Sequence, residues 1–346
     1  MPIGLSCPLP LAQYPKITMA HGGGGRLMHM LIDELFTTAF GKTEEHDGAT
    51  LEVEGGRIAI TTDSFVVKPL FFPGGNIGTL AVNGTVNDLA ACGAVPKALT
   101  AGFILEEGLP TETLWRVVLS MAAAAEVAGV PIVTGDTKVI EHRDGNGLFI
   151  NTTGLGMVAD GVSIAAGRAR PGDRVLINGS IAAHGVAVMS VREGLKFESD
   201  LKSDCAPLAE MVQRLLTAVG PTAVHVLRDP TRGGVATTLC EISCAAHCCV
   251  VIHEETVPVA DGAMGACEIL GLDPLYVANE GKMLIIVAPD SADAALATLR
   301  AHPDGKDAAI IGEVVESPQG RVIGRNTFGG ERVLDMHSGE QLPRIC

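Results

Sequence analysis

Aromatic and cationic residues are scarce in this chain. Its 346 residues include one Trp and two Tyr, and 25 Lys and Arg stand against 40 Asp and Glu, for a formal charge of −15. A nucleic-acid-binding surface needs cations that neutralise phosphates and rings on which bases stack. We therefore expect no nucleic-acid partner. The same acidity disfavours binding to anionic membranes.

Targeting and membrane-spanning patterns are also lacking. The first fifteen residues carry no basic cluster before an apolar run, and prolines interrupt them. Nothing in the chain reads as a transmembrane helix. Nine cysteines without a secretory signal indicate free thiols in a reducing compartment. We expect a cytoplasmic protein with no membrane partner.

Strand-like and helical stretches alternate along the chain, which is typical of an α/β fold. In the first half we expect strands at 57–67, 131–137 and 148–159, and helices at 76–94 and 111–128, the latter capped by Thr111. In the second half we expect strands at 174–180, 249–255, 282–289 and 308–316, and helices at 184–194, 205–219 and 235–246.

The length favours two domains. A segment rich in Gly and Pro, 165–173, marks the boundary. We predict an N-terminal extension (1–16), an N-terminal domain (17–168), a C-terminal domain (169–317) and a C-terminal tail (318–346).

The motif HGGGGR, 21–26, lies between a short strand-like stretch and a helix. Successive glycine N–H groups beside a helix N-terminus form an anion-binding nest suited to phosphates. The candidate residues are His21, Gly22, Gly23, Gly24 and Gly25. The loop lacks the Lys-Ser/Thr ending of a P-loop, and the alternative is a flexible turn.

Carboxylates stand at the ends of several apolar segments. They are Asp63, Asp88, Asp136 and Asp229, with Asp47 as a weaker member. Oxygen ligands from separate segments suit Mg²⁺ that carries nucleotide phosphates. Each Asp taken singly is better explained as a capping or turn residue, and the metal interpretation depends on the whole set together with the glycine loop. Lys138 and Glu280 form a candidate acid/base pair, and the alternative is an ordinary surface pair.

Cysteines attract attention at two places. Cys240, Cys244 and Cys248 are spaced to share one helix stripe, with His247 and Cys249 beside them, and they read either as buried small residues or as a metal site. The chain ends on Cys346. The last eleven residues span about 36 Å when fully extended, so they can carry this thiol across a domain.

Several motifs together are similar to those of one family. HGGGGR, TTDSFVVKPLFFPGGNIG, NDLAACGAVP, GFILEEGLP, VTGDTKV, DPTRGGV, ANEGK and the terminal PRIC resemble the HypE carbamoyl dehydratases, which mature hydrogenases. The likeness runs from His21 to Cys346, whereas residues 1–16, with Cys7, have no counterpart. The wider group includes aminoimidazole ribonucleotide synthetase and selenophosphate synthetase.

This resemblance implies two α/β domains and a homodimer whose N-terminal sheets pair into a barrel-like interface. ATP would bind beneath the glycine loop, and Asp63, Asp88 and Asp229 would lie near Mg²⁺ and phosphates. The match of Asp47 to this set is weaker. The residues that would line the same cleft are Asn87, Asp136 and Lys138.

The resemblance also implies a reaction. The carbamoyltransferase HypF would load a carbamoyl group onto Cys346, and this chain would use ATP to dehydrate the thiocarboxamide to a thiocyanate. The cyanide would pass to iron on a HypC–HypD complex, as a ligand for a [NiFe] hydrogenase. Two alternatives are a selenophosphate synthetase-like enzyme and a cysteine-based metallochaperone.

Overall fold

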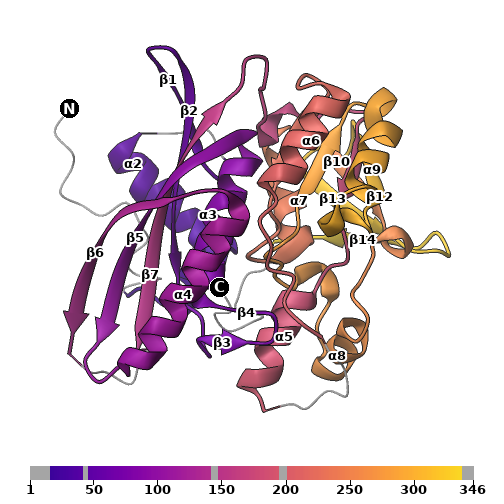
Figure 1. Ribbon diagram of the computed structural model, residues 1–346. Helices are drawn as coiled ribbons and strands as arrows, with labels where there is room; N and C mark the ends of the chain where they lie inside the picture. The colour runs from indigo at the N-terminus through magenta and orange to yellow at the C-terminus, as the bar shows by residue number, and fades with distance from the viewer. Residues whose placement is uncertain (1–15, 42–45, 142–146, 195–200, 337–346) are drawn as a thin grey trace.

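Two sheet-containing halves lie side by side in the protein (Figure 1). The computed structural model describes residues 16–41, 46–141, 147–194 and 201–336. A five-stranded sheet belongs to the first half, up to residue 158, and a seven-stranded sheet belongs to the second half, from residue 174. The expected mixed α/β architecture with two units is confirmed.

The first sheet has the order β1-β2-β7-β5-β6. Its strands are β1 (Ala49–Val53), β2 (Gly56–Phe65), β5 (Ala94–Glu106), β6 (Ile132–Ile140) and β7 (Leu148–Val158). Neighbouring strands are antiparallel except β5 and β6, which run parallel. A small ribbon of β3 (Phe71–Phe72) and β4 (Gly75–Asn76) precedes the first long helix.

Two long helices cover one face of this sheet. Helix α3 (Ile77–Ala91) packs against β2, β5 and β7, and α4 (Thr111–Ala128) packs against α3. The α3 sequence is apolar or small on nearly every side, so the helix is buried between the sheet, α4 and the second half. The side chain of Asn76 caps it, accepting a hydrogen bond of 2.8 Å from the N–H of Gly78.

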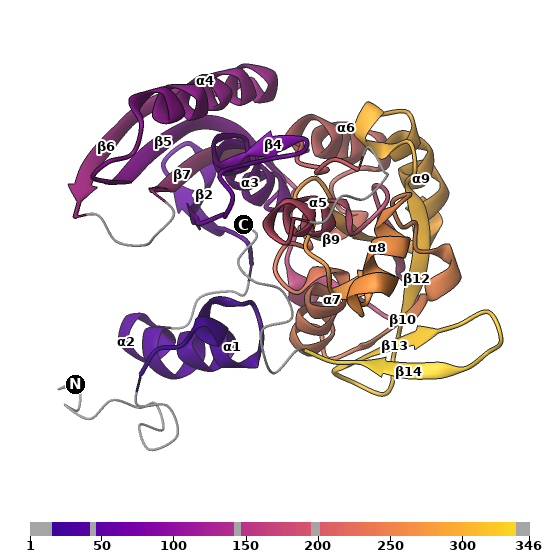
Figure 2. The same cartoon turned by 90° about the horizontal axis from the view of Figure 1, so that it is seen from below.

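A helical segment follows the glycine loop and lies apart from α3 and α4 (Figure 2). It consists of α1 (Arg26–Leu31), a π-helical turn (Ile32–Phe36) and α2 (Thr37–Phe40). A short 3₁₀ turn, Met19–Gly22, leads into the loop.

The second sheet has the order β14-β13-β10-β12-β8-β11-β9. Its strands are β8 (Arg174–Ile177), β9 (Val224–Arg228), β10 (Cys249–His253), β11 (Leu284–Val287), β12 (Ala309–Val315), β13 (Arg321–Arg325) and β14 (Glu331–Leu334). Only β10 and β13 pair in parallel. The predicted tail, 318–346, therefore begins with a hairpin that extends the second sheet.

Helices cover both faces of the second sheet. They are α5 (Ala183–Arg192), α6 (Ala209–Val219), α7 (Gly234–Ala245), α8 (Ala263–Leu270) and α9 (Ala292–Arg300). Alternate residues of β8 point to opposite faces. Leu176 joins α6, α9 and the core of the first half, whereas Val175 and Ile177 join α7 and α8. One apolar core thus runs across the boundary between the halves.

The helices and strands expected between residues 57 and 316 are present, with shifted ends. The strand-like stretch expected before the glycine loop is not a strand, and it ends in the 3₁₀ turn Met19–Gly22. Helix α4 has the predicted bounds, but its N-cap is Pro110, so Thr111 is the first helical residue and not the cap. Helix α6 begins at Ala209 because residues 205–208 belong to an irregular segment held by Asn87. No helix in the described ranges is long and apolar enough to cross a membrane. The domain boundaries themselves stay a prediction.

Close packing of α3 on α4 gives a stability prediction. A Cβ at Gly78 would lie 2.6 Å from the carbonyl oxygen of Val117, so Gly78→Ala should lower the free energy of unfolding by ~1–3 kcal/mol. Gly265 in α8 faces open space, and Gly265→Ala should raise it by ~0.5–1 kcal/mol. Urea denaturation measures both. A Gly78→Ala protein as stable as wild type would contradict the tight crossing.

Candidate active site

A cavity of about 480 Å³ opens between the two halves. The helical segment after the glycine loop, strand β2, helix α3 and the loops that follow β9 and precede β11 all contribute to its lining. Seven carboxylates and two arginines line it: Asp33, Asp47, Asp63, Asp88, Asp229, Glu241, Glu280, Arg228 and Arg232. The cavity is therefore one place where the excess of acidic residues in this chain is concentrated.

Two of the predicted acids face each other from opposite halves. Asp88 lies on α3, and Asp229 follows β9. Burial raises the pKa of the Asp88 carboxyl well above its usual range, and the negative charges of Asp229 and Asp63 raise it further. The pKa of Asp229 is raised in the same way, by burial and then by Asp47. Thr61 donates a hydrogen bond of 2.7 Å to Asp88 and partly offsets these effects.

The Asp63 side chain is one-third exposed at the mouth of the cavity. Desolvation raises its pKa, while the guanidinium of Arg232, 3.6 Å away, opposes the shift. Arg232 itself belongs to the DPTRGG segment that leads into α7. The ion pair therefore joins the first sheet to the start of a helix in the second half.

Arg228 holds the inner end of the cavity together. Its Nε lies 2.6 Å from Asp47 Oδ1, and one of its terminal nitrogens lies 2.6 Å from Glu241 Oε2. The other Glu241 oxygen is 3.1 Å from His29 Nε2 on α1. Burial alone would raise the pKa of Glu241, but the hydrogen bonds with His29 and Arg228 outweigh it and hold that pKa below its ordinary value.

The glycine loop is braced against the second half. Gly24 has φ +77°, and a Cβ there would lie 2.6 Å from the Cβ of Arg232, so no other residue fits without displacement. Of the five predicted loop residues, Gly24 lines the cavity. His21 is buried and hydrogen-bonds Thr18, 2.9 Å from Nδ1 to Oγ1. Gly22 and Gly23 precede Gly24, and Gly25 is the N-cap of α1.

Arg26, the last residue of the motif, makes an ion pair with Asp335, which directly follows β14. The Tyr276 hydroxyl donates a hydrogen bond of 3.0 Å to the Asp335 carbonyl. The glycine loop and the point where the C-terminal segment leaves the second sheet are thus tied together.

Glu280 reaches the cavity from the loop before β11. It is 4 % exposed, and burial raises the pKa of its carboxyl well above the usual range, with further contributions from Asp229 and Asp63. Asn87, predicted to face the nucleotide, instead donates hydrogen bonds to the carbonyls of Ala206 (3.0 Å) and Glu280 (3.1 Å). It therefore joins the halves behind the cavity.

Two predicted residues lie elsewhere. Asp136 and Lys138 stand on β6, 2.6 Å apart and about 70 % exposed. They line a different, shallow cavity with Ser64, Ile104 and Asn151 on the outer face of the first sheet. The hydrogen bond from Lys138 lowers the pKa of Asp136. Lys138 and Glu280 do not meet within one chain.

The cysteine stripe is shorter than predicted. Helix α7 ends at Ala245, and His247 turns the chain with φ +50°, so Cys248 lies beyond the helix. Burial raises the pKa of Cys240 to about 12 and that of Cys248 to about 11, which keeps both thiols protonated, whereas Cys244 is exposed. Within the described ranges, no three His, Cys, Asp or Glu side chains converge to hold a metal. Cys7 and Cys346 lie outside the described residues.

The carboxylates nevertheless fit a hard cation that arrives with a ligand. Asp47 Oδ2 is buried and has no hydrogen-bond partner in the described part of the chain. Seven acids around two arginines leave an excess of negative charge that a bound cation would offset. Mg²⁺ is commonly held by one or two carboxylates together with phosphates and waters, and needs no preformed cage.

Sequence reasoning missed Arg228, Glu241, His29 and Thr61. A signal for Arg228 existed, because a cation that ends the apolar strand VHVLR and precedes Asp229 is expensive to bury without partners. Nothing in the spacing of Glu241 or His29 relates them to this strand.

Comparison with known proteins shows the class of protein to which this chain belongs. Residues 45–158 match the N-terminal domain, and residues 170–325 the C-terminal domain, of the AIR synthase related proteins. Together they cover most of the chain, which therefore has the fold of an AIR synthase related protein.

Closer relatives name the family. The carbamoyl dehydratase HypE of Rhizobium leguminosarum bv. viciae is 52 % identical over 334 residues, 96 % of this chain and 95 % of that protein. A HypE chain from a HypE–HypF complex superposes with a TM-score of 0.84 at 48 % identity, covering 89 % of this chain and 99 % of that chain. The structure of a HypE in complex with ATP superposes with a TM-score of 0.81 at 48 % identity, covering 94 % of this chain and 98 % of that chain. The chain belongs to the family of HypE carbamoyl dehydratases.

Removing the buried cation should destabilise the protein. Arg228→Gln leaves Asp47 and Glu241 buried without their partner and should cost ~3–5 kcal/mol of unfolding free energy near neutral pH. The exposed Arg214, paired with Glu210 on α6, is the control, and Arg214→Gln should cost less than ~1 kcal/mol.

The same variant should have an altered pH dependence. The depressed pKa of Glu241 means that its stabilising contribution is present above the unfolded-state pKa and is lost as the pH falls through the folded-state pKa. The difference in unfolding free energy between wild type and Arg228→Gln should therefore become smaller as the pH falls. Denaturant titrations across the acidic range measure it, and a gap that widens toward low pH would contradict the assignment.

Proposed function

We propose that this chain dehydrates a carbamoyl group carried on its own Cys346 to a thiocyanate, at the expense of ATP, and so supplies the cyanide ligand for the iron of a [NiFe] hydrogenase. The observation that carries the proposal is the 52 % identity to a carbamoyl dehydratase over 96 % of the chain. The ATP complex of a HypE with 48 % identity supports the nucleotide. The acidic interdomain cavity is the site in which we place the chemistry.

The reaction needs ATP because a carbamoyl oxygen is a poor leaving group. The oxygen of the thiocarboxamide attacks the γ-phosphorus of ATP, ADP leaves, and the nitrogen loses its first proton. The carbon–oxygen bond then breaks, the oxygen departs within phosphate, and the nitrogen loses its second proton as the C≡N bond forms. Transfer of this kind relies mainly on positioning and electrostatic stabilisation.

Residues of the cavity divide these tasks. The glycine loop from His21 to Gly25 offers backbone N–H groups to the phosphates. Asp63, Asp88 and Asp229, with Asp47 behind them, would hold Mg²⁺, which supplies positive charge to the transferring phosphoryl group. Glu280 is the base for the nitrogen protons, because its elevated pKa brings it toward the working pH.

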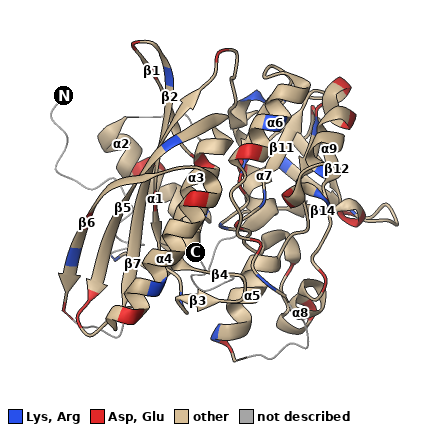
Figure 3. Cartoon of the chain, viewed as in Figure 1, with Lys and Arg blue, Asp and Glu red and all other residues tan. Residues whose placement is uncertain are grey.

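A homodimer would complete the site. The face of the first sheet opposite α3 and α4 exposes apolar side chains on neighbouring strands, among them Ile60, Val95, Ile104, Leu155 and Met157. Strand β7 at its centre carries no charge (Figure 3). Such a face is suited to cover by a second copy of the sheet, which closes the barrel-like interface.

This arrangement accounts for the position of two predicted residues. Asp136 and Lys138 lie on the exposed face of the sheet and line the same cavity as Ser64 of β2. Ser64 directly follows Asp63 in that strand. Pairing of the sheets would enclose them and bring them toward the nucleotide of a partner. Lys138 would then act beside Glu280 of the other chain.

The proposed partners follow from the substrate. HypF would load the carbamoyl group, as the 48 % identity to a HypE from a HypE–HypF complex supports. A HypC–HypD complex would accept the cyanide on iron. Free thiols at all seven described cysteines are in keeping with a cytoplasmic location.

Two acids that line the cavity should be required for ATP turnover. Asp88→Asn and Asp63→Asn should each abolish Mg²⁺-dependent ATP hydrolysis and leave the dimer intact, because each loses a charge that offsets Mg²⁺. The exposed Asp290 serves as a control, and Asp290→Asn should hydrolyse ATP normally. Phosphate release and size-exclusion chromatography measure both properties. Normal turnover in either site variant would remove that residue from the metal site.

Intact-mass spectrometry tests the thiol and the base together. Cys346→Ser should bind ATP but accept no carbamoyl group from HypF, since a hydroxyl is a far weaker nucleophile than a thiol near neutral pH. Glu280→Gln should accept the group yet lose water slowly. In wild type the loss of water should quicken as the pH rises through the elevated pKa of Glu280.

Two results would count against these roles. Dehydration at the normal rate in Glu280→Gln excludes Glu280 as the base. A thiocyanate in Cys346→Ser means that another cysteine carries the group, with Cys7 the first to examine.

A further inference from the structure

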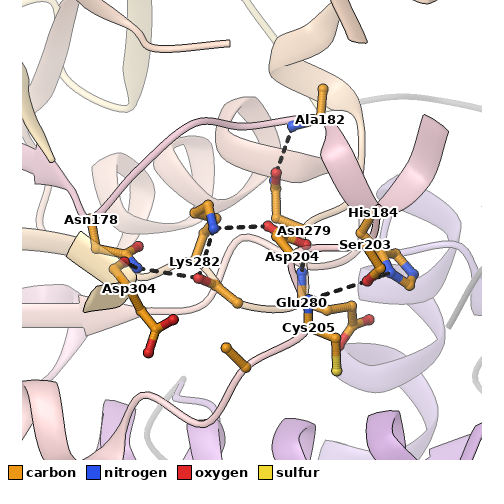
Figure 4. A network of polar contacts seen from close by, with 12 residues as sticks. Asn178, Ala182, His184, Ser203, Asp204, Cys205, Asn279, Glu280, Lys282 and Asp304 are labelled. Carbon is orange, nitrogen blue, oxygen red and sulfur yellow. Dashed lines mark hydrogen bonds and ion pairs between the residues drawn. The ribbon is translucent and has the colours of Figure 1, made fainter. Parts of the chain in front are cut away.

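Two irregular segments cross each other behind Glu280. One is the stretch that precedes α6, and the other is the loop before β11 (Figure 4). Gly281 packs so closely there that a Cβ would lie 1.8 Å from the carbonyl oxygen of Asp204. Ser203 fastens the first segment to the other half, donating its N–H to the Pro73 carbonyl at 2.8 Å. The crossing is therefore fixed by backbone contacts on both sides.

The backbone of Glu280 is held on both sides of its Cα. Its N–H donates to Asp204 Oδ1 at 3.1 Å, and its carbonyl accepts from Asn87 Nδ2 at 3.1 Å. These two contacts fix the peptide planes on either side of its Cα. The point on the backbone from which the Glu280 side chain enters the cavity follows from them.

Asp204 is itself paired with Lys282. The ammonium lies 3.2 Å from Asp204 Oδ2 and donates to the carbonyl of Gly281 at 3.0 Å. The two side chains are 10 % and 7 % exposed. Burying such a pair is costly, and similar pairs are often replaced by apolar residues without loss of stability. Stability alone therefore does not explain its presence next to the base.

We propose that Asp204 and Lys282 are positioning residues for the dehydration step. Lys282 fixes the rotamer of Asp204, and Asp204 in turn holds the N–H of Glu280, so that the carboxylate points at the nitrogen of the bound thiocarboxamide. Neither residue lines the cavity, so neither touches the substrate. The inference rests on the role of Glu280 proposed above and adds the residues that position this side chain.

The test separates the hydrogen bond to Glu280 from the buried charges. Asp204→Asn/Lys282→Met removes both charges and keeps an oxygen that accepts from the Glu280 N–H. Asp204→Leu/Lys282→Met also removes both charges but lacks the acceptor. The two proteins differ at one similar-sized side chain, so a difference between them reports on the acceptor.

Each protein is loaded by HypF with carbamoyl phosphate and ATP, and the loss of one water is followed by intact mass at saturating ATP. The Asn variant should dehydrate more slowly than wild type, because Lys282 no longer fixes its amide, and the Leu variant about 10- to 100-fold more slowly than the Asn variant, as expected for a misplaced base. Carbamoyl loading and ATP affinity, measured by calorimetry, should match wild type in both.

The control is a second buried carboxyl with a hydrogen-bonded partner in the same half. Asp173 and His225 lie 2.7 Å apart and are 3 % and 7 % exposed, but neither lines the cavity. Asp173→Asn should lower the denaturation midpoint and leave the dehydration rate unchanged.

Three outcomes would overturn the inference. A Leu variant that dehydrates as fast as the Asn variant shows that the acceptor does not position Glu280. A comparable loss of rate in Asp173→Asn attributes the effect to stability. Wild type that is loaded but never loses water defeats the proposed function and the inference with it, which distinguishes that failure from the first two.

Discussion

Burial of several carboxylates in one cavity is the constraint on which the rest of this molecule depends. Asp88 and Asp229 come from opposite halves of the chain, and burial raises the pKa of both carboxyls. The charge of Asp229 raises the pKa of Asp88 further, so these carboxyls oppose contact between the halves. Two features oppose this: an apolar core that is continuous across the boundary, and Arg228, which binds an acid from each half. In the free protein, packing therefore keeps together an excess of carboxylates whose negative charge a bound cation would offset.

The architecture was largely readable from the sequence. Periodicity located the long helices and most strands, because α4 and α7 carry regular apolar spacing between clear breakers. Strand β5 carried no comparable signal, since it is long, contains Gly and Pro, and mixes buried with exposed positions. The hairpin of β13 and β14 was taken for tail because Gly- and Arg-rich stretches lack the alternation of a half-buried strand.

Motifs predicted which acids meet, but not how they are held. Of the carboxylates predicted together with the glycine loop, Asp63, Asp88 and Asp229 line one cavity, and Glu280 lines it as well. Asp136 lies in another cavity. Asn87 shows the limit, since the resemblance implied a place in the nucleotide cleft, whereas its side chain makes hydrogen bonds to the second half. A linear motif likewise cannot say whether Asp136 and Lys138 serve the site of their own chain or of a partner.

In the proposed function, the residues after Met336 are a tether that carries the reacting group on Cys346. The ion pair between Arg26 and Asp335 joins the start of this tether to the glycine loop. Ten residues separate Met336 from Cys346, so the thiol stays within about 33 Å of a point bound to the glycine loop. Such a tether supplies the reacting group at an effective concentration in the millimolar range, whatever the concentration of the protein. If Cys346 carries the carbamoyl group, as proposed, its dehydration in the same chain is a first-order process that dilution does not slow, and the thiol is ready for another cycle only after the proposed acceptor has removed the cyanide.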